Sequence, residues 1–421
     1  MLSQFLYDTG IRLYTAAIRV AALRNTKAQQ WVQGREGWQA KVKKALAQHK
    51  GEQLAWFHCA SLGEFEQGRP VIEAFKTAFP EHKVMLTFFS PSGYEIRKNY
   101  AQADYVFYLP PDTAANAQEW IYLTEPSVVF FVKYEFWNYY LRELKHHNIP
   151  TVSFSAIFRN SQVFFKGYGN FYREILACFD QIFVQNQASV ELVESIGLRN
   201  AVIGGDTRFD RVADLVNNPR AIPIAQKFKN QQQLLIVGSA WPQDMDVILP
   251  VLNKMANRPK VMVVPHEIDF EHIETWRSTF GGKSICFSEA EEETVNQYDM
   301  LIIDNVGMLS VLYQYADVAW IGGAYGKGLH TTLEAATFGM PIFFGNKNYK
   351  KFQEANDLIA AEVAVPIANA TDFQQPLEKL MASASARDEI KQKSKEYVRS
   401  KVGATAKVIH WYHDYLLQKK S

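Results

Sequence analysis

The chain has 421 residues, and its 45 basic and 44 acidic side chains give a formal net charge of only +1, which offers no reason to expect a nucleic-acid partner. A hydrophobic content of 48% and a charged content of 21% are those of a globular protein, long enough for two domains of about 200 residues each. Three distant cysteines without a C-x-x-C pair argue against a disulfide framework or a zinc site and fit a reducing cytoplasm. No H-E-x-x-H, G-x-S-x-G or P-loop sequence supports a metalloprotease, hydrolase or P-loop ATPase.

Residues 1–24 form a candidate amphipathic helix that lacks the 18 apolar residues of a membrane span and the features of a secretory signal. Its polar side chains recur every three or four residues and so share one face. Two interpretations stay open: a helix in a membrane interface with its arginines near anionic headgroups, or a terminal helix packed on the protein's own surface. The polar face holds Gln4, Asp8, Arg12, Thr15 and Arg19, and apolar residues such as Leu6, Leu13, Ala17 and Val20 cover much of the rest.

Short apolar runs alternate with helical patterns from residue 54 onward, which predicts parallel sheets covered by helices on both faces. The segment 213–233 is polar, contains Asn217-Asn218-Pro219, and is predicted to be a linker. The first set of predicted strands is 54–60, 83–89, 104–109, 127–132, 150–155, 181–184 and 201–204. The second set is 234–237, 260–264, 284–287, 300–303, 318–321, 341–344 and 363–367.

The alternation predicts an α/β protein with two Rossmann-like domains facing a central cleft, in which ligands bind beyond the carboxyl ends of the strands. The predicted parts are a membrane-associated helix, an acceptor-side domain, the linker, a nucleotide-sugar-binding domain and a helical tail that crosses back onto the first domain. Their bounds are 1–30, 31–212, 213–233, 234–386 and 387–421.

Three charged residues follow predicted strands of the first domain. Glu64 comes after Ser61-Leu-Gly63 at the start of a helix, where it is either a general base at the cleft or a helix-capping residue. Lys133 ends another strand, where packing explains it poorly. Arg208 either neutralises a phosphate or carboxylate or forms an ion pair with Asp206 or Asp210.

The second domain has a glycine-rich segment, Gly322–Gly328, between a predicted strand and a predicted helix. Its glycines let backbone approach a ligand, and the N-terminus of the following helix favours an anion such as a phosphate. Glu334, one turn into that helix, is placed to reach ribose hydroxyls, although a loop that merely uses glycine to turn is the plain alternative. Other residues that follow strands are Pro265 and His266, and Val306, Gly307 and Met308.

Taken together, these motifs resemble the 3-deoxy-D-manno-octulosonic acid (Kdo) transferases over nearly the whole chain. The order and spacing of the motifs make the resemblance specific. The matching pieces are Gly34-Arg35-Glu-Gly37, Ser61-Leu-Gly63-Glu64, Ser90-Pro91-Ser92-Gly93, Glu135-Phe-Trp137, Gly205-Asp-Thr-Arg208-Phe-Asp210, Val264-Pro265-His266 and Gly322-Gly323 through Ala336.

The resemblance implies a GT-B glycosyltransferase fold, the cytoplasmic face of an inner membrane, and inverting transfer of Kdo from CMP-Kdo to a lipid A precursor without metal or bound cofactor. Glu64 matches the family's catalytic base, with Lys133 and Arg208 as further catalytic candidates. The positions that match its CMP contacts are Pro265, His266, Val306, Gly307, Met308, Thr331, Thr332, Leu333 and Glu334.

The sequence departs from the family pattern at several of these positions. Many members have an acidic residue where Lys133 stands, an arginine at His266, a glutamate at Met308, Asn-Pro at Thr331-Thr332, and a lysine at Arg208. The change at position 133 reverses the charge and puts its role in doubt. Two other functions stay open: a nucleotide-sugar epimerase or a GT-B transferase with another donor, and a non-catalytic membrane-bound module that holds a nucleotide sugar or lipid.

Overall fold

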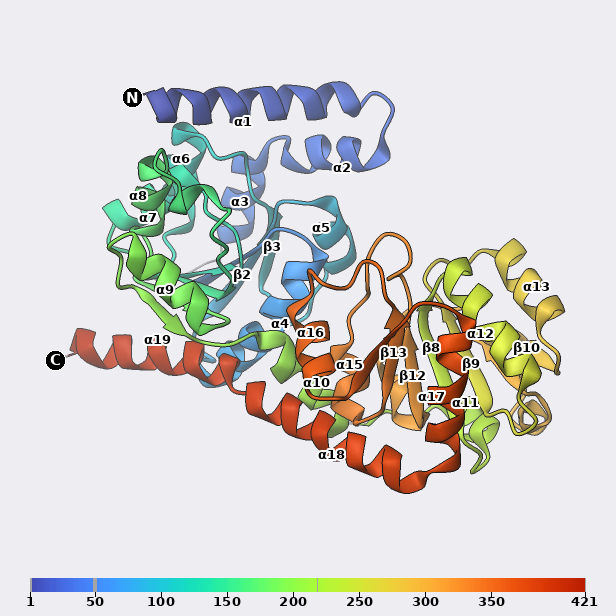
Figure 1. The fold of residues 1–421 in the computed structure, drawn as a ribbon. Helices are drawn as coiled ribbons and strands as arrows, with labels where there is room; N and C mark the ends of the chain where they lie inside the picture. The colour runs from blue at the N-terminus through green and yellow to red at the C-terminus, as the bar shows by residue number, and fades with distance from the viewer. Residues whose placement is uncertain (1, 48–50, 218, 421) are drawn as a thin grey trace. The chain divides into compact units, whose positions relative to one another are not determined.

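The computed structural model describes residues 2–47, 51–217 and 219–420; Met1, residues 48–50, Asn218 of the predicted linker and Ser421 lie outside the described residues. The chain forms two compact units. Unit 1 consists of Met1–Arg211 together with Val402–Ser421, and unit 2 consists of Val212–Lys401. Each unit is a parallel sheet flanked by helices (Figure 1).

Unit 1 is built on a seven-stranded sheet with the order β3-β2-β1-β4-β5-β6-β7, in which all pairs are parallel. Its strands are β1 (Leu54–Cys59), β2 (Lys83–Phe88), β3 (Tyr105–Tyr108), β4 (Val128–Val132), β5 (Thr151–Ala156), β6 (Gln181–Val184) and β7 (Ala201–Ile203). Its helices are α1 (Leu2–Ala21), α2 (Thr26–Arg35), α3 (Trp38–Leu46), α4 (Leu62–Ala78), α5 (Pro91–Arg97), α6 (Ala114–Thr124), α7 (Asn138–His146), α8 (Asn170–Leu176), α9 (Gln187–Ser195), α10 (Thr207–Asn217, which runs across the boundary between the units) and α19 (Ala404–Lys420).

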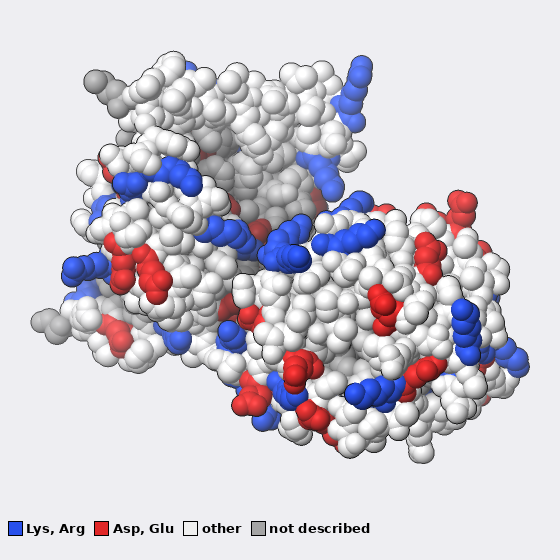
Figure 2. Space-filling view, in the orientation of Figure 1, with Lys and Arg blue, Asp and Glu red and all other residues white. Residues whose placement is uncertain are grey.

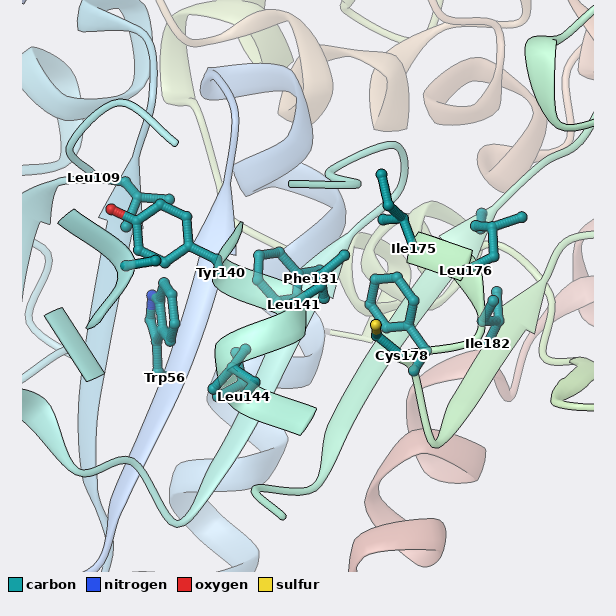
Figure 3. Packing of buried hydrophobic residues seen from close by; sticks show 14 of the residues in the cluster. Trp56, Leu109, Phe131, Tyr140, Leu141, Leu144, Ile175, Leu176, Cys178 and Ile182 are labelled. Carbon is teal, nitrogen blue, oxygen red and sulfur yellow. The ribbon is translucent and has the colours of Figure 1, made fainter. Parts of the chain in front are cut away.

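The strands of unit 1 are apolar throughout because both faces of the sheet are covered. Successive residues of β1 point to opposite faces, so Trp56 packs in one core cluster and Phe57 in the other. Figure 3 shows the first cluster, where Trp56 lies beside Tyr140 and Leu144 of α7.

Unit 2 repeats the plan with the parallel order β10-β11-β9-β8-β12-β13-β14. Its strands are β8 (Leu234–Ala240), β9 (Lys260–Pro265), β10 (Ser284–Cys286), β11 (Met300–Ile302), β12 (Val318–Ile321), β13 (Ile342–Gly345) and β14 (Ala364–Ile367). Its helices are α11 (Pro223–Lys229), α12 (Pro242–Lys254), α13 (Phe270–Thr279), α14 (Leu309–Leu312), α15 (Leu333–Phe338), α16 (Gln353–Ala360), α17 (Ala370–Ala382) and α18 (Ala384–Lys401).

The fourteen strands coincide, within a few residues, with the fourteen apolar runs, and the predicted α/β fold is confirmed. The segment 213–233 holds the end of α10 and helix α11, whose Ala225 and Phe228 are fully buried. The C-terminal region forms α18 in unit 2 and α19 in unit 1.

Helix α19 packs on α4, and its Val408 and Tyr412 are buried in a core cluster of unit 1. The Tyr412 hydroxyl lies 2.9 Å from Nε2 of His82. Asp210 fixes the start of the helix because its carboxylate accepts the backbone N–H groups of Gly403 and Thr405 at 2.6 and 2.7 Å. The last helix of the chain is therefore part of the unit that the first half of the chain builds.

Helix α1 packs on unit 1 through its polar face. Tyr7 donates a hydrogen bond to Asp112, and the Tyr139 hydroxyl donates to Asp8 at 2.6 Å. The apolar side chains face outward instead: Leu6, Leu13 and Val20 are 60%, 65% and 68% exposed. This orientation reverses that of a helix packed on its own protein in water, the second of the two interpretations of the sequence. Among the described helices, none has the length and apolar character needed to cross a membrane.

Candidate functional site

Each sheet has one switch point, a pair of neighbouring strands whose connections to the next strand run to opposite sides of the sheet. In unit 1 it lies between β1, which leads to β2, and β4, which leads to β5; in unit 2 it lies between β8 and β12. Ligands of open α/β sheets bind outside the carboxyl ends of strands at such a switch point. Glu64 and Lys133 follow the two strands of the first switch point, and Trp241 and Gly322 follow those of the second.

Glu64 lies in the first turn of α4, which begins directly after the loop from β1. Ser61 is the N-cap, and its side-chain oxygen accepts the backbone N–H of Gly63 at 3.2 Å. The Ser61 hydroxyl also donates a hydrogen bond to Oε2 of Glu64. Glu64 is only partly buried, so its carboxylate is held in place by Ser61 while it stays accessible to a proton donor.

A buried hydrogen-bonded chain lies near the carboxyl end of β1; the sequence analysis singled out its members Glu135 and Trp137 but not their link to His58. His58 Nδ1 lies 2.8 Å from the Thr87 hydroxyl, and His58 Nε2 lies 3.1 Å from Oε2 of Glu135. Trp137 donates its indole N–H to the same carboxylate oxygen at 2.7 Å. Because a carboxylate can only accept, Nε2 of His58 carries a proton in this network and donates it to Glu135. A histidine inside an otherwise apolar strand was the available signal.

Cys59 lies near both carboxylates. Burial raises the pKa of its thiol well above the usual value, and the negative charges of Glu64 and Glu135 raise it further. The effect on one thiol shows that the carboxylates that follow β1 and β4 lie in the same part of unit 1. A buried thiol with a raised pKa is a poor nucleophile, so Cys59 is a packing residue.

Arg208 forms an ion pair with Asp206, one of the alternatives that the sequence left open. Its Nε and one terminal nitrogen lie 2.9 and 2.7 Å from Oδ2 of Asp206. Asp206 is buried and also accepts a hydrogen bond from Gln67 at 3.0 Å. Burial opposes ionisation, but the charge of Arg208 and these hydrogen bonds leave the pKa of Asp206 below its usual value.

Lys133 has a left-handed backbone conformation, with φ of 70°, and its side chain is partly buried. Its ammonium group lies 5.5 Å from the centre of the Tyr134 ring. Within the described part of the chain, no ion pair involves Lys133, so its charge remains available for an anion. Tyr134 links the loop after β4 to the segments after β5 and β7, because the charges of Arg159 and Arg208 both act on the Tyr134 hydroxyl.

In unit 2, the fully buried Asp244 ties together the two loops of the switch point. Its carboxylate accepts hydrogen bonds from the backbone N–H of Trp241 at 3.1 Å, the backbone N–H of Gly323 at 3.0 Å and the indole of Trp320 at 3.1 Å. Burial raises the pKa of Asp244 to about 6. This aspartate, also missed from the sequence, shapes the start of the glycine loop.

The glycine loop needs its glycines. A Cβ on Gly322 would lie 2.1 Å from the carbonyl oxygen of Ser239, and Gly323 has a φ of 93°. The helix that follows, α15, has only six residues and therefore a weaker dipole than the sequence suggested.

Three rings stack at this switch point. The ring centres of Trp241 and His266 are 4.5 Å apart, those of His266 and His330 are 4.3 Å apart, and the Lys327 ammonium lies 4.7 Å from the Trp241 ring. The Trp241 indole donates to Nε2 of His330 at 3.2 Å. Burial, together with the neighbouring His266, lowers the pKa of His330 to about 4, and burial also lowers the pKa of His266. The stack therefore consists of neutral rings at pH 7, with a lysine at one end.

The remaining predicted contacts lie at the ends of the strands of unit 2 or in the loops and first turns that follow them. Pro265 ends β9 next to His266. Val306 is 89% exposed, Gly307 has a φ of 93°, and Met308 precedes α14. Thr331 is exposed, Thr332 and Leu333 are buried at the start of α15, and Glu334 is partly buried near Tyr313, where its charge acts on that hydroxyl. His266 therefore contacts His330, which follows the glycine loop, whereas Glu334 lies near Tyr313.

Across residues 2–47, 51–217 and 219–420, no three histidine, cysteine, aspartate or glutamate side chains group closely enough to hold a metal ion.

Comparison with known proteins supports the family resemblance. A family model described as 3-deoxy-D-manno-octulosonic-acid transferase (kdotransferase) matches residues 35–211. The 3-deoxy-D-manno-octulosonic acid transferase of Aquifex aeolicus is 26% identical over 364 residues, which cover 84% of this chain and 92% of that protein. The protein with the same description from Chlamydia muridarum is 25% identical, with 86% of each chain covered.

Solved structures with similar folds have much lower identity. A UDP-GlcNAc 2-epimerase from Neisseria meningitidis bound to UDP-GlcNAc has a TM-score of 0.61 at 12% identity and covers 87% of this chain and 99% of its own. MurG of Acinetobacter baumannii has a TM-score of 0.55 at 11% identity, with 86% and 99% covered. At these identities the likeness shows the GT-B fold alone. The resemblance to the Kdo transferase family that the motifs predicted is therefore confirmed over most of the chain.

Proposed function

We propose that this chain is an inverting Kdo transferase that moves Kdo from CMP-Kdo to a lipid A precursor, with Glu64 as the general base. The observation that carries the proposal is the place of Glu64: it follows β1 at the switch point of unit 1, is partly open, and is oriented by Ser61. The similarity of residues 35–211 to Kdo transferases supplies the reaction class.

In the proposed reaction, Glu64 takes the proton of an acceptor sugar hydroxyl while that oxygen attacks the anomeric carbon of Kdo. The bond from that carbon to the CMP phosphate oxygen breaks, and CMP leaves with the electron pair. A hydroxyl is too weak an acid to react unaided near pH 7, which is why a positioned carboxylate matters. Lys133, whose charge has no acidic partner among the described residues, and Arg208 serve the donor's carboxylate or phosphate.

We assign the nucleotide to unit 2. The Trp241, His266 and His330 rings offer a flat apolar platform, Lys327 offers a positive charge, and the glycine loop offers backbone close to the ligand. Glu334 is the proposed partner of the ribose hydroxyls. No metal has a role in this proposal, so EDTA is expected to leave the transfer rate unchanged.

The test is the mass of the product formed from CMP-Kdo and a lipid A precursor by purified protein. Addition of Kdo supports the proposal and gives the number of residues transferred. The fold likeness to UDP-GlcNAc 2-epimerases makes UDP-GlcNAc the matched alternative substrate. Epimerisation of UDP-GlcNAc without Kdo transfer would contradict the proposal, and binding of CMP-Kdo without any turnover would favour a non-catalytic module.

The acceptor is a lipid, and the proposed membrane contact is the outward apolar side of α1. Leu2, Phe5, Leu6, Leu13 and Val20 are all at least 60% exposed. In Figure 2 the surface over α1 is almost free of charged side chains in this view, and blue side chains gather where the helix turns toward α2. An apolar helical face of this kind inserts at the boundary between headgroups and acyl chains.

Replacing Leu6 and Leu13 by glutamine tests this contact. Loss of two inserted leucines should weaken vesicle binding roughly 100-fold, because each contributes on the order of 1.5 kcal/mol and about 1.4 kcal/mol corresponds to a factor of ten. Leu417→Gln on α19, whose leucine is 54% exposed, is the matched control and should bind vesicles normally. Undiminished binding by the double variant in co-sedimentation would move the contact away from this face.

A further inference from the structure

A cavity in unit 1 remains outside the mechanism above. It has a volume of about 740 Å³ and lies against α1, α2 and the loop before α6. Its size is that of a site for a small organic molecule or part of a larger one. All of its lining residues belong to unit 1.

The cavity wall carries an excess of positive charge. Arg12, Arg19 and Arg35 line it, and Glu36 is the one acidic residue among the lining side chains that the structure describes. None of the three arginines forms an ion pair with a described residue. Guanidinium groups without carboxylate partners favour a bound anion, and their planar donors suit phosphate oxygens.

Arg35 is a fixed part of the wall. It is 7% exposed and donates hydrogen bonds to the backbone carbonyls of Leu109, Trp31 and Phe89 at 2.8, 3.0 and 2.7 Å. Its guanidinium also lies 4.0 Å from the Trp31 ring. Burial lowers the pKa of Arg35 to about 9, which still leaves it charged at pH 7. Arg12 and Arg19, by contrast, are exposed and free to adjust to a ligand.

The other part of the wall is apolar. Trp31, Trp38, Val32, Ile11 and Pro111 all line the cavity. The indole N–H of Trp31 is buried and has no hydrogen-bond partner within the described part of the chain, which leaves an unsatisfied donor in the wall. A ligand that fits this wall has an apolar part and at least one hydrogen-bond acceptor.

The arginines also lie next to the outward apolar face of α1. Arg12 and Arg19 are seven residues apart and so form one row on the helix, and Leu13 and Val20 form the neighbouring row. An amphiphile can therefore place its charge at the arginines while its chains follow the apolar row. Figure 1 shows α1 running alongside α2 in unit 1.

From these features we infer that the cavity binds an anionic amphiphile, a phosphate monoester that carries acyl chains. Two sources share this chemistry: phosphatidic acid in the membrane, or a phosphate monoester group of the acylated acceptor. The second source rests on the function proposed above, whereas binding itself does not.

Direct binding is tested with dihexanoyl phosphatidic acid below its micelle concentration, and with dihexanoyl phosphatidylcholine for comparison, by titration calorimetry on the full chain. Ala16 lines the cavity at an exposed position, so Ala16→Trp should fill the cavity without unfolding the protein and weaken phosphatidic acid binding tenfold or more. Ala17→Trp is the matched control, since Ala17 is exposed on the same helix and does not line the cavity.

Charge is tested separately. Arg12→Gln with Arg19→Gln should weaken phosphatidic acid binding by roughly tenfold or more and leave phosphatidylcholine unaffected. Arg24→Gln, on an exposed arginine that does not line the cavity, should change nothing. Equal affinity of the Ala16→Trp and Ala17→Trp variants, or no preference of the wild type for the phosphate monoester, would overturn the inference.

A transfer assay in detergent distinguishes the two sources. If the acceptor's phosphate occupies the cavity, Ala16→Trp raises KM for an acceptor lipid that bears a phosphate monoester and not for one that lacks it. If a membrane phospholipid occupies it, KM is unchanged for both acceptors while phosphatidic acid binding still falls. Absence of transfer by the wild type would count against the proposed function, and calorimetry would still report on the cavity.

Discussion

The two switch points have the same strand topology and opposite chemistry. In unit 1, Glu64, Lys133 and Glu135 follow β1 and β4, and Glu135 pairs with His58 near the end of β1, so this edge carries groups that can exchange or hold protons. In unit 2, the loops after β8, β9 and β12 carry neutral stacked rings and a glycine loop, fixed by one buried carboxylate, that of Asp244. In the function proposed above, the same sheet edge serves proton transfer in one unit and recognition of a flat ring in the other, so the side chains that follow the strands, and not the topology, set the chemistry.

The largest expected effect separates catalysis from binding in unit 1. Glu64→Gln keeps size and polarity but removes the base, so kcat should fall by about 100-fold or more while CMP-Kdo still binds. Glu73→Gln, a partly exposed glutamate on the same helix that pairs with Arg69, is the matched control and should keep most of its activity. Retention of more than about a tenth of wild-type kcat by Glu64→Gln would assign the base elsewhere.

Gly323→Ala is the counterpart in unit 2. The residue has a φ of 93°, and a Cβ would lie 2.4 Å from the carbonyl oxygen of Gly328, so strain of about 1–3 kcal/mol is expected. The dissociation constant of CMP-Kdo, measured by calorimetry, should rise tenfold or more. Gly326→Ala is the control in the same loop, because the nearest atom to its Cβ is 4.0 Å away. Similar affinities of the two variants would mean that the loop does not hold the donor.

Arg208 tests whether charge or the ion pair matters more. Arg208→Ala removes the charge and leaves Asp206 buried and unpaired, at a cost of about 3–5 kcal/mol of folding stability. Arg208→Lys keeps the charge and should lose less turnover than the alanine variant, provided that both are assayed below their unfolding temperatures. Equal losses would instead point to the two-pronged hydrogen bonding with Asp206.

The smallest effect concerns the ring stack and pH. The pKa of His330 is lowered from 6.5 to about 4, so the unfolded chain takes up a proton more readily and the stability from this residue is lost as pH falls from about 6.5 to 4. His330→Gln should therefore gain stability relative to the wild type over this range. Because His330 is only partly buried, solvent screens the effect, which is expected to be on the order of 1 kcal/mol at pH 4. The measured quantity is the difference in unfolding free energy between the two proteins, because Asp244, whose pKa is raised to about 6, contributes the opposite slope in both. A difference that does not change with pH would contradict the burial of a neutral His330.

The strands could be predicted because each apolar run is a local signal. In β1 and β12, for example, residues on both faces of the strand are apolar, which indicates that both faces are covered. The pairings within the sites could not. His58 and Glu135 are 77 residues apart, Asp244 and Gly323 are 79 apart, and Asp8 meets Tyr139 across 131 residues. The orientation of α1 was missed for this reason: its hydrophobic pattern identifies the two faces, but only the distant tyrosine shows which of them packs on the protein.

The motif Ser61-Leu-Gly63-Glu64 was enough to predict that Glu64 lies at the start of a helix. It did not predict that the Ser61 hydroxyl donates a hydrogen bond to Glu64. Lys133 has no acidic partner among the described residues, which is compatible with its proposed contact with an anion, but that role stays a prediction. The ring stack of Trp241, His266 and His330 depends on three separate strands of one sheet and leaves no pattern in the linear sequence.

The docking of α19 on α4 has a consequence for synthesis of the protein. Phe75 and Phe130 of unit 1 are covered in part by Tyr412, which leaves the ribosome only after all of Val212–Lys401 has been made. At about 5–20 residues per second, this delay lasts on the order of ten seconds or more. Aromatic surface of the first unit therefore stays uncovered while the second unit is translated, so the nascent chain is a candidate for chaperone binding, and a fragment that ends at Arg211 is expected to aggregate where the full chain does not.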